Sequence, residues 1–185
     1  MYDIKKAYED LRSGRRKKVI LDTDTYNEID DQYALSYLLQ SFDAVELIGV
    51  TAVPFHNWKS ESYADGMERS YQEILNVVSL TKPDFDVPVF RGSTERLKDT
   101  KTPVSSPAAD FIIEQAMACQ NEPLYILGIG ALTNIASALL KEPAIQDKIV
   151  VVWLGCNEIE LDGNAGEFNL DQDYNCLLYT SSRKV

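Results

Sequence analysis

The chain has 185 residues, enough for one well-buried core, and its composition gives no sign of a second domain. Its formal net charge is -11 at pH 7, which argues against a nucleic-acid partner because contacts to phosphates need clustered Lys and Arg. No apolar stretch is long enough to cross a membrane, and three cysteines without metal-ligand spacing suggest reduced thiols. We therefore expect a soluble cytoplasmic protein without nucleic-acid or membrane partners.

The segment before Val19 is polar, and its basic cluster at 15–18 is expected to flank the first strand in solvent. A short apolar run at 19–21 predicts that strand, and four aspartates follow closely: Asp22, Asp24, Asp30 and Asp31. No Lys or Arg lies between Val19 and Gln40. Crowded carboxylates repel one another, so the cluster favours a bound cation. The alternative is a solvated acidic loop that opens a helix.

The rest of the chain alternates between helical and strand patterns. The expected order is a helix at 30–39, a strand at 45–53, a helix at 59–78, a strand at 88–90, a helix at 107–119, a strand at 124–127, a helix at 132–140 and a strand at 149–154. The strands are continuous apolar runs, which is typical of strands covered on both faces. The pattern predicts an α/β fold with an open, mostly parallel sheet and helices on both faces.

In such a fold, ligands bind beyond the carboxyl ends of the strands. Polar residues follow each predicted strand: the aspartates, then Asn57, Arg91-Gly-Ser, Gly128–Asn134 and Gly155-Cys-Asn157. Turn formation explains each group separately, since Gly, Asn and Ser are common in loops. It explains less well why amides and carboxylates recur at the same end of successive strands. We expect the functional site at this edge.

Several of these segments carry a family resemblance. Asp22-Thr-Asp24 with Asp30-Asp31, the segment 130–136 and Glu167-Phe-Asn169 together resemble the inosine-uridine-preferring nucleoside hydrolase family. Segments 49–51, 88–92 and 107–113 match as well, so the likeness extends over 19–173. It implies a Rossmann-like nucleoside hydrolase fold, with residues 1–173 forming one domain that is incomplete at its C-terminus. Residues 174–185 form a divergent tail.

The resemblance implies a calcium-dependent enzyme of purine or pyrimidine salvage that hydrolyses the N-glycosidic bond of ribonucleosides. Asp24 and Asp31 would bind Ca2+ with the backbone carbonyl of Thr133, and Asp24 would also be the catalytic base that accepts a proton from the metal-bound water. The implied substrate-binding residues are Asp30, Asn57, Asn157, Asn164, Glu167 and Asn169, and Asn157 and Asn164 remain alternatives for one position. A hard cation does prefer such oxygen ligands, and carboxylates would stabilise an oxocarbenium-like transition state.

The chain also departs from the family. Residues 25–29 replace a tight Pro-Gly turn and add a carboxylate at Glu28. Family members run longer and end with a further calcium-binding Asp beside a His, whereas His56 is the single histidine here and no Asp follows Asp173. We therefore expect weak calcium binding and poor hydrolysis by this chain alone. An apolar sheet edge favours self-association, so we also expect a homo-oligomer.

Two other interpretations remain open. The segment 20–25 fits the strand-end signature of haloacid-dehalogenase-like phosphatases, in which Asp22 would be the nucleophile and Mg2+ the metal. That family needs a later Lys and a later acidic pair, and the expected pattern is lacking. The other alternative is a non-catalytic remnant that binds a nucleoside or sugar. A calcium titration with a hydrolysis assay would separate these possibilities.

Overall fold

A computed structural model describes residues 3–155 of the chain. Helices and strands alternate along it, as the sequence predicts. The elements are α1 (Ile4–Arg12), β1 (Lys17–Thr23), α2 (Ile29–Gln40), β2 (Val45–Ala52), α3 (Tyr63–Thr81), β3 (Val89–Phe90), α4 (Pro107–Ala118), β4 (Leu124–Gly128), α5 (Thr133–Lys141), the 3-10 helix η1 (Pro143–Asp147) and β5 (Ile149–Trp153). No helix in this part of the chain is both long and apolar enough to span a bilayer.

The strands form one sheet in the order β3-β2-β1-β4-β5, and every neighbouring pair is parallel. From β1 the chain adds β2 and then β3 on one side of the sheet. It then returns to add β4 and β5 on the other side of β1. The strand order therefore reverses between β1 and β4, where a doubly wound sheet opens a crevice for ligands. The predicted α/β fold with a parallel sheet is confirmed.

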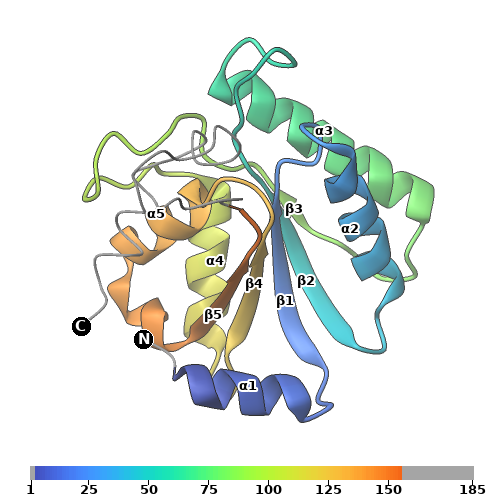
Figure 1. The fold of residues 1–185 in the computed structure, drawn as a ribbon, viewed down its shortest axis with the longest axis vertical. Helices are drawn as coiled ribbons and strands as arrows, with labels where there is room; N and C mark the ends of the chain where they lie inside the picture. Colours follow the sequence, from blue (N-terminus) through green and yellow to red (C-terminus); the bar gives the residue numbers. More distant parts are fainter. Residues whose placement is uncertain (1–2, 156–185) are drawn as a thin grey trace, which may run out of the picture.

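Helices cover both faces of the sheet (Figure 1). α2 and α3 pack on one face, where Leu35 and Ile74 meet Leu21 of β1, and α4 and α5 pack on the other, where Ile112 and Ile135 meet Ile20. Because alternate residues of β1 enter opposite cores, the strand must be apolar without interruption. This explains the continuous apolar runs in the sequence.

The N-terminal helix α1 was not predicted. It lies at the amino ends of the strands (Figure 1), it is capped by Asp3, and Ala7 is its one buried residue. Ile4, Ala7, Tyr8 and Leu11 do recur at helical spacing, but charged residues fill the positions between them, and the segment was therefore interpreted as polar. The hydroxyl of Tyr125 on β4 donates to Asp10 at 2.7 Å and ties the helix to the sheet.

The expectation that the whole basic cluster lies in solvent is wrong. Lys17 is 7% exposed and begins β1, while Arg15 pairs with Asp10 at 2.8 Å and with Glu122 at 2.6 Å. Asp10 is five residues away on α1, a helix that was not predicted, and Glu122 is 107 residues away, so neither pairing could be read from the strand pattern. The predicted helix at 59–78 also starts later, because Ser62 caps α3 through a hydrogen bond from the Asp65 backbone N–H.

Candidate functional site

The end of β1 carries two carboxylates with different surroundings. Asp22 is fully buried, and its Oδ1 accepts hydrogen bonds from Thr51 Oγ1 at 2.6 Å and from Asn134 Nδ2 at 2.9 Å. Among the described residues, its Oδ2 has no hydrogen-bond partner. Burial raises the pKa of Asp22 to about 7, although these two hydrogen bonds oppose the rise. Asp22 is therefore a packed acid whose ionisation is disfavoured by burial.

Asn134, near the start of α5, links the ends of several strands. Its Nδ2 also donates to the backbone oxygen of Ala52 at 2.9 Å, and its Oδ1 accepts from Ser93 N at 2.8 Å and Ser93 Oγ at 3.0 Å. Gly92 has to be glycine here, since a Cβ would lie 1.9 Å from the Ala52 oxygen. The buried amide thus fixes the carboxyl ends of β1 and β2 relative to α5.

Asp24 follows β1 directly and is 2% exposed. Its Oδ2 accepts a hydrogen bond from Asn27 Nδ2 at 3.0 Å. A Cβ at Gly130 would lie 2.7 Å from its Oδ1, so the backbone after β4 packs against the carboxylate. Burial first, and then the negative charge of Asp31, raise the pKa of Asp24 well above its ordinary value. The sheet therefore holds this carboxylate in the crevice between β1 and β4.

Asp31 reaches the same place from the first turn of α2. It is 4% exposed, and Thr23 Oγ1 donates a hydrogen bond to its Oδ1. Burial raises the pKa of Asp31 to about 7, with further contributions from the charges of Asp30 and Glu28 and with Thr23 opposing. Within residues 3–155, no Lys or Arg forms an ion pair with Asp24 or Asp31.

The carboxylates of Asp24 and Asp31 could bind a hard divalent cation from one side. They are buried, they repel each other, and they offer the oxygen donors that such ions prefer. Thr133 is also fully buried, in the segment after β4 whose Gly130 contacts Asp24. No group of three or more His, Cys, Asp or Glu side chains within residues 3–155 is arranged to hold a metal ion. The described side chains thus supply part of a ligand set.

The predicted substrate-binding residues divide into two groups. Asp30 and Asn57 are exposed, on the first turn of α2 and on the loop after β2. Asn57 is linked to the buried site, because its Nδ2 donates to Asn27 Oδ1 at 2.7 Å. The other four lie outside the described residues: Asn157, Asn164, Glu167 and Asn169.

Sequence reasoning missed Asn27. It is 5% exposed, its side chain bonds both Asp24 and Asn57, and its backbone oxygen accepts from Lys59 Nζ. The one available signal was an amide placed three residues after Asp24 in a loop of unusual length. Asn134 was also given no role, although it belongs to the segment that carries the family resemblance.

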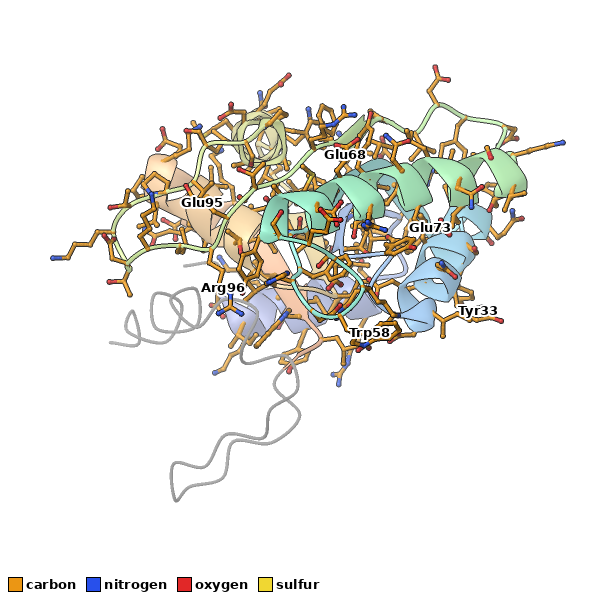
Figure 2. The ribbon with its side chains drawn as sticks, turned by 90° about the horizontal axis from the view of Figure 1, so that it is seen from above. Tyr33, Trp58, Glu68, Glu73, Glu95 and Arg96 are labelled. Carbon is orange, nitrogen blue, oxygen red and sulfur yellow. The ribbon has the colours of Figure 1, made fainter. Side chains whose placement is uncertain are left out.

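One exposed ring, Trp58, and a partly buried ring and two partly buried cations lie on the segments after β2 and β3 and at the start of α3. Figure 2, viewed from above the carboxyl ends of the strands, shows Trp58 and Arg96 on loops near the first turn of α3. The Arg96 guanidinium lies 4.7 Å from the ring centre of Tyr63, and Lys59 Nζ lies 5.2 Å from that of Trp58, which is 88% exposed. A planar apolar group could stack on such a ring.

Residues 19–175 match the family model described as inosine-uridine preferring nucleoside hydrolase. The chain is 26% identical over 191 aligned residues to the pyrimidine-specific ribonucleoside hydrolase RihB of Escherichia coli, which covers 92% of this chain and 56% of that protein. It is 28% identical to the probable uridine nucleosidase 2 of Oryza sativa, over 99% of this chain and 60% of that one.

A solved structure is similar to the same extent. The purine-preferring ribonucleoside hydrolase from Gardnerella vaginalis matches with a TM-score of 0.64 and 27% identity, over 86% of this chain and 56% of that one. The chain thus spans little more than half the length of each of these three relatives.

Proposed function

Because this chain belongs to the inosine-uridine preferring nucleoside hydrolase family, we propose that it hydrolyses the N-glycosidic bond of ribonucleosides to give ribose and free base. The observation that carries the proposal is the pair of buried carboxylates, Asp24 and Asp31, at the point where the strand order reverses. Both are desolvated, and neither is neutralised by a basic side chain within the described residues. Such a pair is costly to fold unless it serves a ligand.

We infer that the cofactor is Ca2+, held by the carboxylates of Asp24 and Asp31 and the backbone carbonyl of Thr133. Their burial and repulsion support this assignment, since carboxylate and carbonyl oxygens are the donors that the ion prefers. When bound, the ion would act as a Lewis acid that lowers the pKa of a water molecule and orients the ribose hydroxyls.

The chain's own residues would then act in sequence. Asp24 accepts a proton from the attacking water while the water oxygen bonds to the anomeric carbon. The base leaves with the electrons of the breaking C–N bond and takes up a proton from solvent. Positive charge develops on the sugar ring, and the nearby carboxylates stabilise it. Asp30 and Asn57, exposed at the mouth of the crevice, bind ribose hydroxyls. Asn157 or Asn164, with Glu167 and Asn169, would complete the sugar contacts.

The two alternatives fare differently. A phosphatase that uses Asp22 as nucleophile is disfavoured, because this carboxyl is fully buried and its Oδ1 already accepts hydrogen bonds from Thr51 and Asn134. A binding protein without turnover gains support from the partial ligand set within residues 3–155. A cytoplasmic location and a homo-oligomer remain predictions from the sequence.

The proposal is tested by incubating the purified chain with inosine or uridine in CaCl2 or in EDTA and measuring the release of ribose. We expect slow release at high calcium concentration, in keeping with the partial ligand set within residues 3–155, and none in EDTA. The matched control is Asp43→Asn, which removes an exposed carboxylate far from the crevice and should behave as wild type. Calcium-dependent nucleoside binding without ribose release would favour the binding protein, and neither binding nor release would overturn both readings.

A further inference from the structure

We propose that Asn27 is a positioning residue that couples the catalytic carboxylate of Asp24 to the substrate-binding amide of Asn57. The inference rests on the proposed function and deepens it. It concerns the loop 25–29, where this chain differs from the turn expected of its family. The longer loop places a buried side chain between the site and its mouth.

Four hydrogen bonds fix Asn27. Its Nδ2 donates to Asp24 Oδ2 at 3.0 Å, and its Oδ1 accepts from Asn57 Nδ2 at 2.7 Å. Its backbone N–H donates to the Asp24 carbonyl at 2.6 Å, and its own carbonyl accepts from Lys59 Nζ. With 5% of its surface exposed, the residue has little freedom to turn. Both ends of its amide are therefore engaged before any ligand binds.

The first consequence concerns Asp24. Asn27 occupies its Oδ2, while Oδ1 lies against the backbone at Gly130. A carboxylate that is hydrogen-bonded at one oxygen and closely packed at the other has little room to rotate, so its remaining lone pairs keep one direction. Asn27 thus prepares Asp24 for proton transfer without touching the substrate.

The second consequence concerns Asn57. Its Oδ1 accepts from the Lys59 backbone N–H at 2.9 Å, and one N–H of its Nδ2 is used on Asn27. A side-chain amide carries two N–H groups, so one remains for a ribose hydroxyl. Because Asn57 is exposed on a loop, the bond to Asn27 restricts its otherwise mobile side chain. Asn27 therefore orients both the side chain that contacts the sugar, Asn57, and the carboxylate that takes part in the reaction, Asp24.

Side-chain chemistry explains why this position needs an amide. Asparagine offers one donor for Asp24 and one acceptor for Asn57. Leucine has a similar volume and offers neither. Aspartate keeps the acceptor for Asn57, but it loses the donor and adds a negative charge beside Asp24 and Asp31. Asn27→Leu therefore removes both side-chain hydrogen bonds, whereas Asn27→Asp removes only the one to Asp24.

The experiment compares Asn27→Leu, Asn27→Asp, Asn57→Leu and the double variant Asn27→Leu/Asn57→Leu with wild type. Calcium affinity is measured by calorimetry without nucleoside, kcat and KM are measured with inosine, and thermal unfolding checks the fold. The matched control is Asn76→Leu, which removes an exposed amide on α3 that bonds only surface Glu73. The control should match wild type in all of these measurements.

For Asn27→Leu we expect calcium affinity and kcat to fall about 10- to 100-fold and KM to rise. Asn57→Leu should raise KM and leave calcium affinity unchanged. The double variant should have the KM of Asn27→Leu, since Asn57 is already unsupported there. Asn27→Asp should lower kcat and keep KM near the wild-type value, a division that loss of folding alone does not produce.

Wild-type values in a folded Asn27→Leu, or KM effects that simply add in the double variant, would overturn the coupling. If Asn27→Leu does not fold, Asn27→Asp decides: equal losses in kcat and in substrate affinity would mean that Asn27 is only structural. If wild type itself neither binds calcium nor releases ribose, the proposed function fails, and this inference fails with it. An active wild type with unaffected Asn27 variants overturns the inference alone.

Discussion

At the residue scale, Asp22 and Asp24 lie two positions apart but have different surroundings. Asp22 is enclosed by Thr51 and Asn134 and contributes to the packing of the strand ends. Asp24 is held by Asn27 and faces the negative charge of Asp31, so it lies where a cation would be stabilised. Environment, more than residue type, therefore separates a structural acid from a candidate catalytic one.

Replacing Asp24 with asparagine tests its role. Asp24→Asn keeps the size of the side chain but removes the ligand charge and the proton acceptor. We expect kcat for ribonucleoside hydrolysis to fall about 10²- to 10⁴-fold. In EDTA the melting temperature should be equal to or above that of wild type, because repulsion with Asp31 is lost. Near wild-type turnover in the purified variant would mean that another residue activates the water.

At the scale of elements, the site depends on where connections leave the sheet. The segments after β1 and β4 meet because these strands are neighbours, and the loop after β2 joins them through Asn27 and Asn57. α3 then passes over that loop so closely that a Cβ at Gly66 would lie 1.9 Å from the backbone oxygen of Phe55. A helix, a loop and two strand ends are thus packed as one unit.

Gly66→Ala tests this close approach. Intrinsic helix propensity alone would favour alanine by about 1 kcal/mol. The clash with the Phe55 backbone should outweigh this gain and give a net loss of about 1–3 kcal/mol in the free energy of unfolding. Urea denaturation provides the measurement. Asn76→Ala, at an exposed position of the same helix, should be neutral or slightly stabilising. A Gly66→Ala variant more stable than wild type would show that α3 is not held against the loop.

At the scale of the whole molecule, the buried carboxyls of the site destabilise the folded state, and the rest of the fold must offset this free energy. Two apolar cores, one on each face of the sheet, stabilise the strands whose ends carry the buried carboxyls. The net charge of -11 adds general repulsion. Stability should therefore depend on pH and on cations.

The pKa of Asp22 and the pKa of Asp31 are each about 7 in the folded chain, whereas an aspartate in an unfolded chain has a pKa of about 3.9. Between these values the folded chain binds more protons, so stability falls as pH rises, by up to about 1.4 kcal/mol per pH unit for each carboxyl. In EDTA we expect a higher melting temperature at pH 5 than at pH 8.

Calcium should reduce this difference by stabilising ionised Asp31 at pH 8. Asp22→Asn should also reduce it, because that group no longer titrates, while Asp43→Asn serves as the control. Calorimetry at the two pH values, with EDTA and with CaCl2, gives all of these melting temperatures. A wild type that melts higher at pH 8 than at pH 5 in EDTA would show that burial does not govern these carboxyls.

The sequence alone determined the fold class and the edge of the sheet where the candidate site lies. Continuous apolar runs require strands covered on both faces, and parallel strands bring their carboxyl ends together. The acidic cluster after the first strand could therefore be singled out before any coordinates, and the family resemblance then indicated Asp24 and Asp31 within it. The helix α1 was missed although Ile4, Ala7, Tyr8 and Leu11 have helical spacing, because charged residues fill the rest of that segment; its hydrogen bond to Tyr125 could only come from the tertiary structure.

Only the tertiary structure decided how the carboxylates differ and which side chains hold them. Burial depends on segments that are distant in sequence, such as Thr51 and Asn134 around Asp22, and local pattern carries no record of such contacts. Asn27 shows the same limit. In the sequence it is one polar residue in a loop, and it gains a role because β1 and β2 are neighbours, which places Asp24 and Asn57 on either side of its amide.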